Sequence, residues 1–255
     1  MKFIERGGVR LAYTEAGAGD PPLLLVHGMR CNYTHMLPQM GHFMRRHRVL
    51  NVDLRGHGAS DAPESMYSND EINDDLVFLC RELGIEKPIG VGHSFGGSTL
   101  LHLAANRPEA LGGLVVLDSG VRSAESRVAE LGKTPVMTPE EGRAFLEARL
   151  FSPDDPTDLK TRIIGEMAHM PPHVSKGCGQ TVLTFDAAEA AERCTVPALF
   201  LLADRPFTDP ETLARLGPNW RVGQVVGAGH FIHMVVPDQV NAMIERFIEL
   251  LGTRP

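Results

Sequence analysis

The chain has 255 residues, of which 43% are hydrophobic and 22% are charged, as is usual for a folded globular protein. Its formal net charge of -7 argues against nucleic acid as a partner, because nucleic-acid-binding domains usually carry a basic patch. The apolar runs are shorter than the roughly 20 residues that span a bilayer, and residues 1–8 lack the apolar stretch of a secretory signal. We therefore expect a cytoplasmic protein that has no membrane partner.

The cysteines and histidines give no pattern of a metal site. Cys31, Cys80, Cys178 and Cys194 form no close C-x-x-C pair, which signals neither a zinc site nor a dithiol redox motif. Scattered free thiols fit a reducing compartment. His169 and His173 are four residues apart, but Pro171 and Pro172 between them break a helical zinc pair. We expect no metal.

Short apolar runs alternate with helix-like segments in the first half of the chain. Residues 23–26 and 49–54 are rich in Leu or Val and are followed by glycine, which predicts two buried strands. The following segments are predicted as a helix at 71–83, a strand at 88–92, a helix at 98–105 and a strand at 114–117. This alternation predicts an α/β fold with a mostly parallel, doubly wound sheet and helices on both faces.

The alternation stops after the strand at 114–117. Residues 120–194 are mostly helix-like and are interrupted by prolines, and strands return at 196–202 and 221–226 before an amphipathic helix at 238–251. We therefore predict a core made of residues 1–119 and 196–255, with residues 120–195 inserted as a helical lid, or cap.

The pentapeptide Gly92-His93-Ser94-Phe95-Gly96 lies where a predicted strand gives way to a predicted helix, the context that makes a G-x-S-x-G match meaningful. A sharp turn there strains the central residue and requires small neighbours, because a Cβ atom at either glycine would clash. The turn presents the Ser94 hydroxyl at the end of the sheet and above a helix N-terminus, which favours negative charge. Ser94 is the candidate nucleophile, and the alternative is an incidental serine in a glycine-rich turn.

His230 is the candidate base. It follows Gly227-Ala228-Gly229, beyond the last predicted strand, where an imidazole can take the proton of a serine and return it to a leaving group. His233 is the competing choice, and a buried histidine bonded to the backbone is the alternative interpretation. Acyl transfer also needs two backbone N–H donors for the oxyanion. Met29, in the loop after His27-Gly28, and Phe95 are predicted to supply them.

The order of four motifs resembles the α/β-hydrolase fold superfamily. These motifs are His27-Gly28, Asp53-Leu54-Arg55-Gly56-His57-Gly58-Ala59-Ser60, Gly92-His93-Ser94-Phe95-Gly96-Gly97 and Gly229-His230-Phe231. The resemblance spans nearly the whole chain outside the cap, and it implies a Ser94–His230 dyad completed by an acid. It does not identify the substrate, because many activities share this fold. The segment from Asp53 to Gly58 is expected to be architectural.

The acid has two candidates. In most members of the superfamily it follows the penultimate strand in a Gly-x-x-Asp pattern, but this chain has Pro206 at the expected position. Asp204 is close to that position and is the alternative acid. Asp118, which ends the strand after the nucleophile helix, is preferred, since some branches of the superfamily place their acid there. Asp209 is predicted to cap the helix that follows it.

The resemblance implies that the cap and the loop after His27-Gly28, residues 29–33, select the substrate. The apolar side chains of the cap suit an apolar or aromatic group, although each of them can instead pack within the cap itself. They are Met137, Phe145, Phe151, Met167, Met170 and Phe185.

The leading hypothesis is a serine hydrolase that cleaves a carboxylic ester or lactone of a small, largely apolar substrate through an acyl-enzyme, with no cofactor. Carbon–carbon bond hydrolysis or cofactor-independent ring-cleaving dioxygenation is the second hypothesis, and a non-catalytic ligand-binding protein is the third. A small molecule is the expected partner, and a homodimer is left open.

Overall fold

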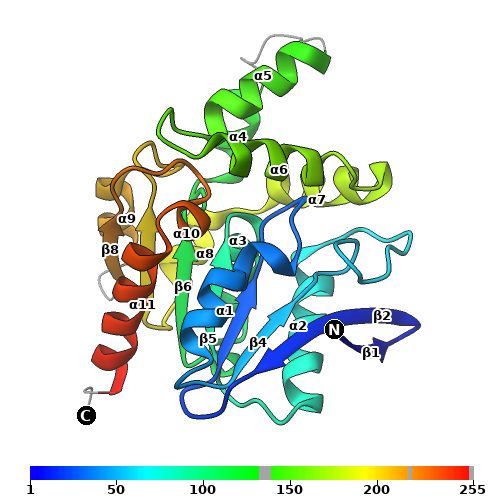
Figure 1. Cartoon of the computed structure of the whole chain (residues 1–255), viewed down its shortest axis with the longest axis vertical. Coiled ribbons are helices and arrows are strands. Elements are labelled where there is room, and N and C mark those ends of the chain that lie inside the picture. The colour runs from blue at the N-terminus through cyan, green and yellow to red at the C-terminus, as the bar shows by residue number, and fades with distance from the viewer. Residues whose placement is uncertain (132–138, 218–219, 253–255) are drawn as a thin grey trace.

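The computed structural model describes residues 1–131, 139–217 and 220–252 of the chain (Figure 1). Its strands are β1 (Lys2–Arg6), β2 (Val9–Ala16), β3 (Leu23–Val26), β4 (Val49–Val52), β5 (Ile89–His93), β6 (Gly113–Leu117), β7 (Ala198–Leu202) and β8 (Trp220–Gln224). Its α-helices are α1 (Leu37–Phe43), α2 (Asn69–Glu82), α3 (Phe95–Asn106), α4 (Ala124–Leu131), α5 (Pro139–Leu150), α6 (Thr157–Met167), α7 (Pro172–Thr184), α8 (Ala187–Arg193), α9 (Pro210–Leu216), α10 (Ile232–Val235) and α11 (Pro237–Gly252). Two 3₁₀ turns, η1 (Tyr33–Met36) and η2 (Pro108–Ala110), complete the described elements.

Within the described residues, the strands form one sheet in the order β1-β2-β4-β3-β5-β6-β7-β8. The pairs from β4 to β8 are parallel, and only β1 with β2 and β2 with β4 are antiparallel. Helices cover both faces of this sheet, so the predicted fold class is confirmed. The carboxyl ends of the parallel strands all lie at one edge of the sheet, where residues from several strands can meet.

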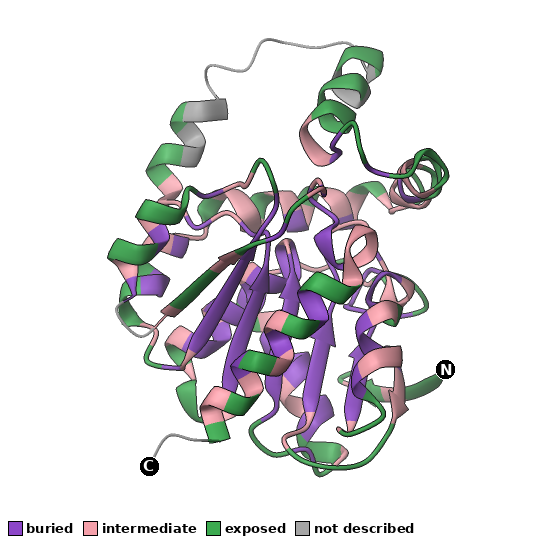
Figure 2. Cartoon of the chain, turned by 60° about the vertical axis from the view of Figure 1, so that its left-hand side comes forward, coloured by how far each residue is buried: buried purple, intermediate pink, exposed green. Residues whose placement is uncertain are grey.

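Each face of the sheet is buried under its own set of helices. Leu24 and Val26 of β3 belong to a core cluster with side chains of α2, α3 and α8, whereas Leu23 and Leu25 point to a second cluster with α1 and α11. Successive side chains of a strand alternate between the faces, so a strand with apolar residues at every position is buried on both sides. Figure 2 shows the result, with buried strands between helices whose outer faces are exposed.

The N-terminal hairpin was not predicted. Strands β1 and β2 pair through a two-residue turn at Gly7 and Gly8, whose φ angles are 58° and 80°. Such a turn requires positive φ at both central residues, which glycine adopts without steric cost. The Gly-Gly pair is therefore the sequence signal that could have identified the hairpin.

Helices α4 to α8 stand between β6 and β7, where the cap insertion was predicted, and Figure 1 shows α4 to α7 together beyond one end of the sheet. Helix α8 instead packs against the core helix α3, and its Ala187, Ala190 and Ala191 are fully buried. The cap boundaries at residues 120 and 195 remain a prediction. None of the described helices has both the length and the apolar character of a membrane span.

Candidate active site

Ser94 occupies a sharp turn between β5 and α3. Its φ and ψ angles of 50° and -114° lie in a region that non-glycine residues rarely adopt. The turn is held by the hydrogen bond that the Ser94 amide donates to the carbonyl oxygen of Leu117, 3.0 Å away on β6. Strain of this kind persists only when the surrounding structure enforces it, and it is concentrated at functional sites.

The glycines around Ser94 are required by close contacts between backbones. A Cβ atom on Gly92 would lie 2.6 Å from the carbonyl group of Gly96, and one on Gly96 would lie 2.5 Å from the carbonyl oxygen of His27. Helix α3 could not approach β3 and β5 so closely with any larger residue at these positions. The predicted role of the two glycines is confirmed.

His230 is paired with Asp118. The Nδ1 atom of His230 lies 2.7 Å from Oδ2 of Asp118, and both side chains are buried. A carboxylate can only accept in this bond, so the proton is on Nδ1, and Nε2 is left free to take a proton. The second oxygen of Asp118 accepts from the amide of Ala203 at 3.2 Å, which fixes the plane of the carboxylate.

Asp204, the alternative acid, lies elsewhere. Its carboxylate oxygens accept from the amide of Gly227 at 3.2 and 3.0 Å, and its side chain is exposed. It therefore stabilises the beginning of the loop that carries His230 without bonding to the imidazole. Asp209 caps α9 by accepting from the amide of Thr212 at 2.8 Å, as predicted.

His233, the competing base, is fully buried in α10 and has no hydrogen bond from either ring nitrogen within the described part of the chain. Burial lowers its pKa well below the ordinary value, as does the nearby His35. The ring packs 4.3 Å from that of His93. His233 therefore has neither an acid partner nor access to solvent.

The Ser94 hydroxyl is partly exposed, and it makes no hydrogen bond to any residue that the structure describes. The turn that carries Ser94 and the loop that carries the base are neighbours, because the ring of the adjacent His93 is 4.5 Å from the ring of His230. Catalytic hydrogen bonds are often long in the absence of substrate and tighten in the reactive complex.

The two predicted oxyanion donors are free. Within the described ranges, neither the amide of Met29 nor that of Phe95 donates to another protein group. Phe95 is the first residue of α3, whose dipole also favours an anion. The loop that carries Met29 is fixed by Asp53, which accepts from the amide of Tyr33 at 2.6 Å and from that of Ala59 at 2.9 Å.

The segment after β4 is architectural, as expected. Arg55 is buried and binds Asp75 in α2 through Nε and one terminal nitrogen, at 2.5 and 2.8 Å. His27 donates from Nδ1 to the carbonyl of Gly28 and accepts from the amide of Leu54 at Nε2, so it links this segment to the Met29 loop. Burial lowers the pKa of His27 to about 3, which keeps the ring neutral.

Two cavities are lined by residues that contact or follow the site residues. One, of about 760 Å³, is lined by Phe207, whose ring contacts that of His230 edge-on at 4.7 Å. The other, of about 430 Å³, is lined by Arg30, the residue after Met29, and by Met170 of the predicted cap. Both linings mix apolar with polar or charged groups. The polar or charged groups of the 760 Å³ cavity include Arg122, Ser123, Thr208 and Asp209. Those of the 430 Å³ cavity include Asn32, His57, Glu166 and His169.

The cap side chains that were expected to line an apolar pocket are dispersed. Phe145 is 51% exposed on α5, so neither a pocket nor the packing of the cap encloses it. Phe151 and Met167 pack in a small cluster with Phe231, and Phe185 packs against the main core. Of the set, Met170 lines a cavity next to the site, and Met137 lies outside the described residues.

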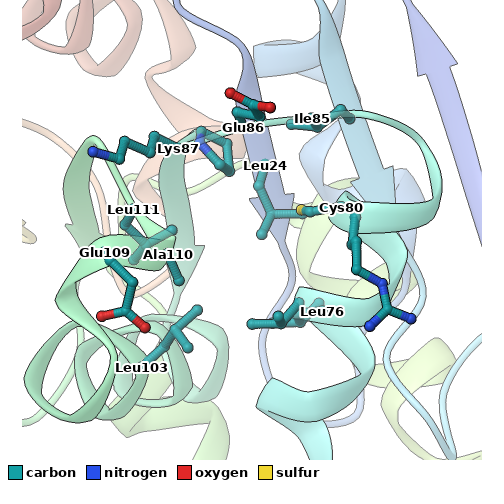
Figure 3. A pocket seen from close by; sticks show the side chains of 13 residues that line it. Leu24, Leu76, Cys80, Ile85, Glu86, Lys87, Leu103, Glu109, Ala110 and Leu111 are labelled. Carbon is teal, nitrogen blue, oxygen red and sulfur yellow. The ribbon is translucent and has the colours of Figure 1, made fainter.

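A third cavity, of about 370 Å³, lies at the opposite end of the sheet (Figure 3). Leu24, Leu76 and Leu103 point into it, and Glu86 and Lys87 stand among the charged residues of its lining. The Cys80 thiol also lines it, but burial raises the pKa of that thiol to about 12, which makes it a poor nucleophile. This cavity is remote from Ser94 and lacks the groups needed for acyl transfer.

The structure adds two residues that the sequence analysis had not assigned. His93 was read only as part of the pentapeptide, yet its Nε2 lies 3.0 Å from the carbonyl oxygen of His230. Asp155 carried no sequence signal, because its partner Gly229 is 74 residues away. The described residues include no trio of His, Cys, Asp or Glu that could hold a metal ion.

Comparisons with known proteins agree with this fold. Residues 23–243 match the profile described as "Alpha/beta hydrolase family". The chain is 30% identical to 2-(acetamidomethylene)succinate hydrolase of Mesorhizobium japonicum, over 96% of this chain and 94% of that protein. It is 25% identical to 3-oxoadipate enol-lactonase 2 of Acinetobacter baylyi, over 93% and 92% of the two chains. A thermophilic esterase from Thermogutta terrifontis shares the fold, with a TM-score of 0.84, 24% identity, and coverage of 99% of this chain and 100% of that chain.

Proposed function

The chain belongs to the α/β-hydrolase family, and from its site we propose that it hydrolyses a carboxylic ester or lactone through an acyl-enzyme on Ser94. The observation that carries the proposal is the buried pair of His230 and Asp118, 2.7 Å apart, at the edge of the sheet where the strained Ser94 turn lies. A nucleophile, a base and an acid that orients the base are the parts that activated serine requires.

The Ser94 oxygen attacks the substrate carbonyl carbon while Nε2 of His230 takes the hydroxyl proton. The carbonyl oxygen becomes an oxyanion that the amides of Met29 and Phe95 stabilise, and each such donor is worth about 3 kcal/mol in the transition state. The tetrahedral intermediate collapses, the carbon–oxygen bond to the alcohol breaks, and His230 returns the proton to the leaving oxygen. Water then repeats these steps on the acyl-enzyme, which releases the acid and restores Ser94.

Asp118 has two effects in this scheme. It holds the proton on Nδ1, so that Nε2 can accept the proton of Ser94. It also stabilises the imidazolium that forms in each half-reaction. Its own second oxygen is bound to the amide of Ala203. The carboxylate is therefore preorganised before substrate arrives.

The two cavities beside the site support a small substrate with both apolar and polar parts. Phe207 offers an aromatic surface next to the base, while Arg30 and Arg122 bring guanidinium groups to the two linings. Named relatives include an enol-lactonase and a 2-(acetamidomethylene)succinate hydrolase, which supports hydrolysis over ring-cleaving oxygenation.

The test compares wild type, Ser94→Ala and Ser98→Ala with p-nitrophenyl acetate and butyrate. We expect Ser94→Ala to lose about 10³-fold or more in kcat, because nothing replaces the nucleophile. Ser98 is in the same helix but bonds to Ser119, 2.8 Å away, so its variant should keep its activity. A fluorophosphonate should label wild type at Ser94. Undiminished turnover by Ser94→Ala would overturn the proposal, and a protein that neither reacts with the phosphonate nor turns over any ester would instead be a ligand-binding member of the family.

Hydrolysis of an amide is a second candidate, favoured by the relative whose name contains an acetamido group. The same acyl-enzyme can form when an amine rather than an alcohol leaves. N-acetylated substrates assayed for acetate release distinguish the two. A higher kcat/KM with them than with the matching acetate esters would favour this candidate.

A further inference from the structure

The connection between α5 and α6 lies against the loop that carries His230. This segment, residues 150–155, is called the strap below. Phe151, Ser152 and Asp155 of the strap are buried, whereas Phe145 and Leu146, shortly before it on α5, are about half exposed (51% and 52%). The strap is therefore buried where it meets the base loop, unlike this exposed part of α5.

Three consecutive residues of the base loop each contact the strap. The amide of Gly229 donates to Oδ1 of Asp155 at 2.9 Å, and the amide of His230 donates to the carbonyl of Leu150 at 2.7 Å. The ring of Phe231 stacks on that of Phe151, with centroids 5.4 Å apart and planes 17° from parallel. The backbone on the N-terminal side of the base is thus held by the cap.

Asp155 is the side chain that joins the two segments. Its Oδ2 accepts from the amide of Ser152 at 2.9 Å, so one carboxylate bonds both the strap and the base loop. Among the described residues its side chain accepts from these two backbone N–H groups and forms no ion pair with a basic residue. Hydrogen bonds to a charged acceptor are about twice as strong as neutral ones.

The spacing between the segments leaves no room for a side chain on the loop. A Cβ atom on Gly229 would lie 2.6 Å from Oδ2 of Asp155 and 2.7 Å from the carbonyl oxygen of Leu150. The close approach of the strap therefore explains why residue 229 is a glycine. The residue of the loop that has a positive φ, of 82°, is Gly227.

We propose that Asp155 is a positioning residue for His230, so that the base is correctly placed only while the strap is seated on the core. The inference rests on the proposed function of His230 as the base. Asp118 fixes the ring through Nδ1, and His93 bonds the carbonyl oxygen of His230. Asp155 and Leu150 fix the two amides before the ring, and a displacement of about 1 Å in a catalytic group can cost 10²-fold in rate.

The test uses Asp155→Ala and Asp155→Asn, with Asp154→Ala as the matched control, because Asp154 is the adjacent aspartate and is exposed. With p-nitrophenyl acetate we expect Asp155→Ala to lose about 100-fold in kcat with KM changed less than twofold. Asp155→Asn keeps one acceptor oxygen for Gly229 and should retain at least ten times the kcat of the alanine variant. Asp154→Ala should match wild type.

A second readout needs no substrate. In wild type and Asp154→Ala, the proton between Nδ1 of His230 and Asp118 should give a low-field NMR resonance, assigned by its loss in Asp118→Asn. This resonance should shift or broaden in Asp155→Ala. If Asp155→Ala does not fold, the test uses Asp155→Asn in its place. A kcat that is reduced in this variant while KM is unchanged would support the inference. Wild-type kcat and an unshifted resonance in a folded Asp155 variant would overturn it. Turnover that persists in Ser94→Ala would refute the proposed function instead, and the NMR comparison would still test the role of Asp155.

Discussion

Nδ1 of His230 lies 2.7 Å from Oδ2 of Asp118, although 112 residues separate them in the chain. Asp118 directly follows β6 and has a φ of 44°, and His230 is on the loop after β8. Both residues lie at the same edge of the sheet because the strands from β4 to β8 run parallel. Asp204 also lies at this edge, but its carboxylate is bound to Gly227.

We predict that Asp118→Asn reduces kcat by about 10³- to 10⁴-fold, because an amide there no longer selects the tautomer that leaves Nε2 free. Steady-state kinetics with p-nitrophenyl acetate measure this loss. Asp204→Asn is the matched control and should keep most of the wild-type kcat, since Asp204 is exposed and bonds only the loop backbone. The assignment of the acid would be reversed if Asp204→Asn were the inactive variant.

We predict that Gly96→Ala destabilises the protein by about 1–3 kcal/mol or more, because the added Cβ meets backbone atoms that cannot move independently. The nearest are the carbonyl oxygens of His27 and Val26, at 2.5 and 2.6 Å. Gly179→Ala in α7 is the control. Its Cβ meets nothing within 4 Å, so the variant should gain up to about 1 kcal/mol of helix stability. Urea unfolding measures both, and equal stabilities of the two variants would contradict the prediction.

We predict that the buried histidines make the fold sensitive to acid. Burial lowers the pKa of His57 to about 3, and that of His27 likewise to about 3, whereas the unfolded chain titrates near 6.5. Between these pH values the unfolded state binds more protons, so stability is full above pH 6.5 and falls as the pH drops toward 3. Each histidine contributes a slope of up to about 1.4 kcal/mol per pH unit.

Urea unfolding of wild type and His57→Leu from pH 8 to pH 4.5 tests this prediction. The variant loses the hydrogen bond from Nδ1 of His57 to the carbonyl of Arg55 at every pH, so its stability at pH 8 is the reference. The slope below pH 6.5 should be shallower in the variant by up to about 1.4 kcal/mol per pH unit. Identical slopes would show that His57 does not resist protonation in the folded state.

Much of the fold could be predicted because its signals are local. The run at residues 23–26 coincides with β3, because a strand buried on both faces is apolar at every position. The Ser94 turn could also be placed from local signals. Its two glycines are required by close backbone contacts at the point where β5 meets α3. The exposure of Phe145 could not be predicted, since an apolar residue in a helix does not reveal what that face of the helix contacts.

The sequence by itself determined the fold family, the strained serine turn and the histidine after the last strand, since each depends on residues adjacent in the chain. Tertiary structure alone decided which aspartate the histidine meets. Asp118 and Asp204 both lie at the carboxyl edge of the sheet, but only Asp118 has an oxygen within hydrogen-bond distance of Nδ1 of His230, whereas both oxygens of Asp204 accept from the amide of Gly227. It also revealed Asp155, because a hydrogen bond between segments 74 residues apart leaves no periodic trace in the sequence.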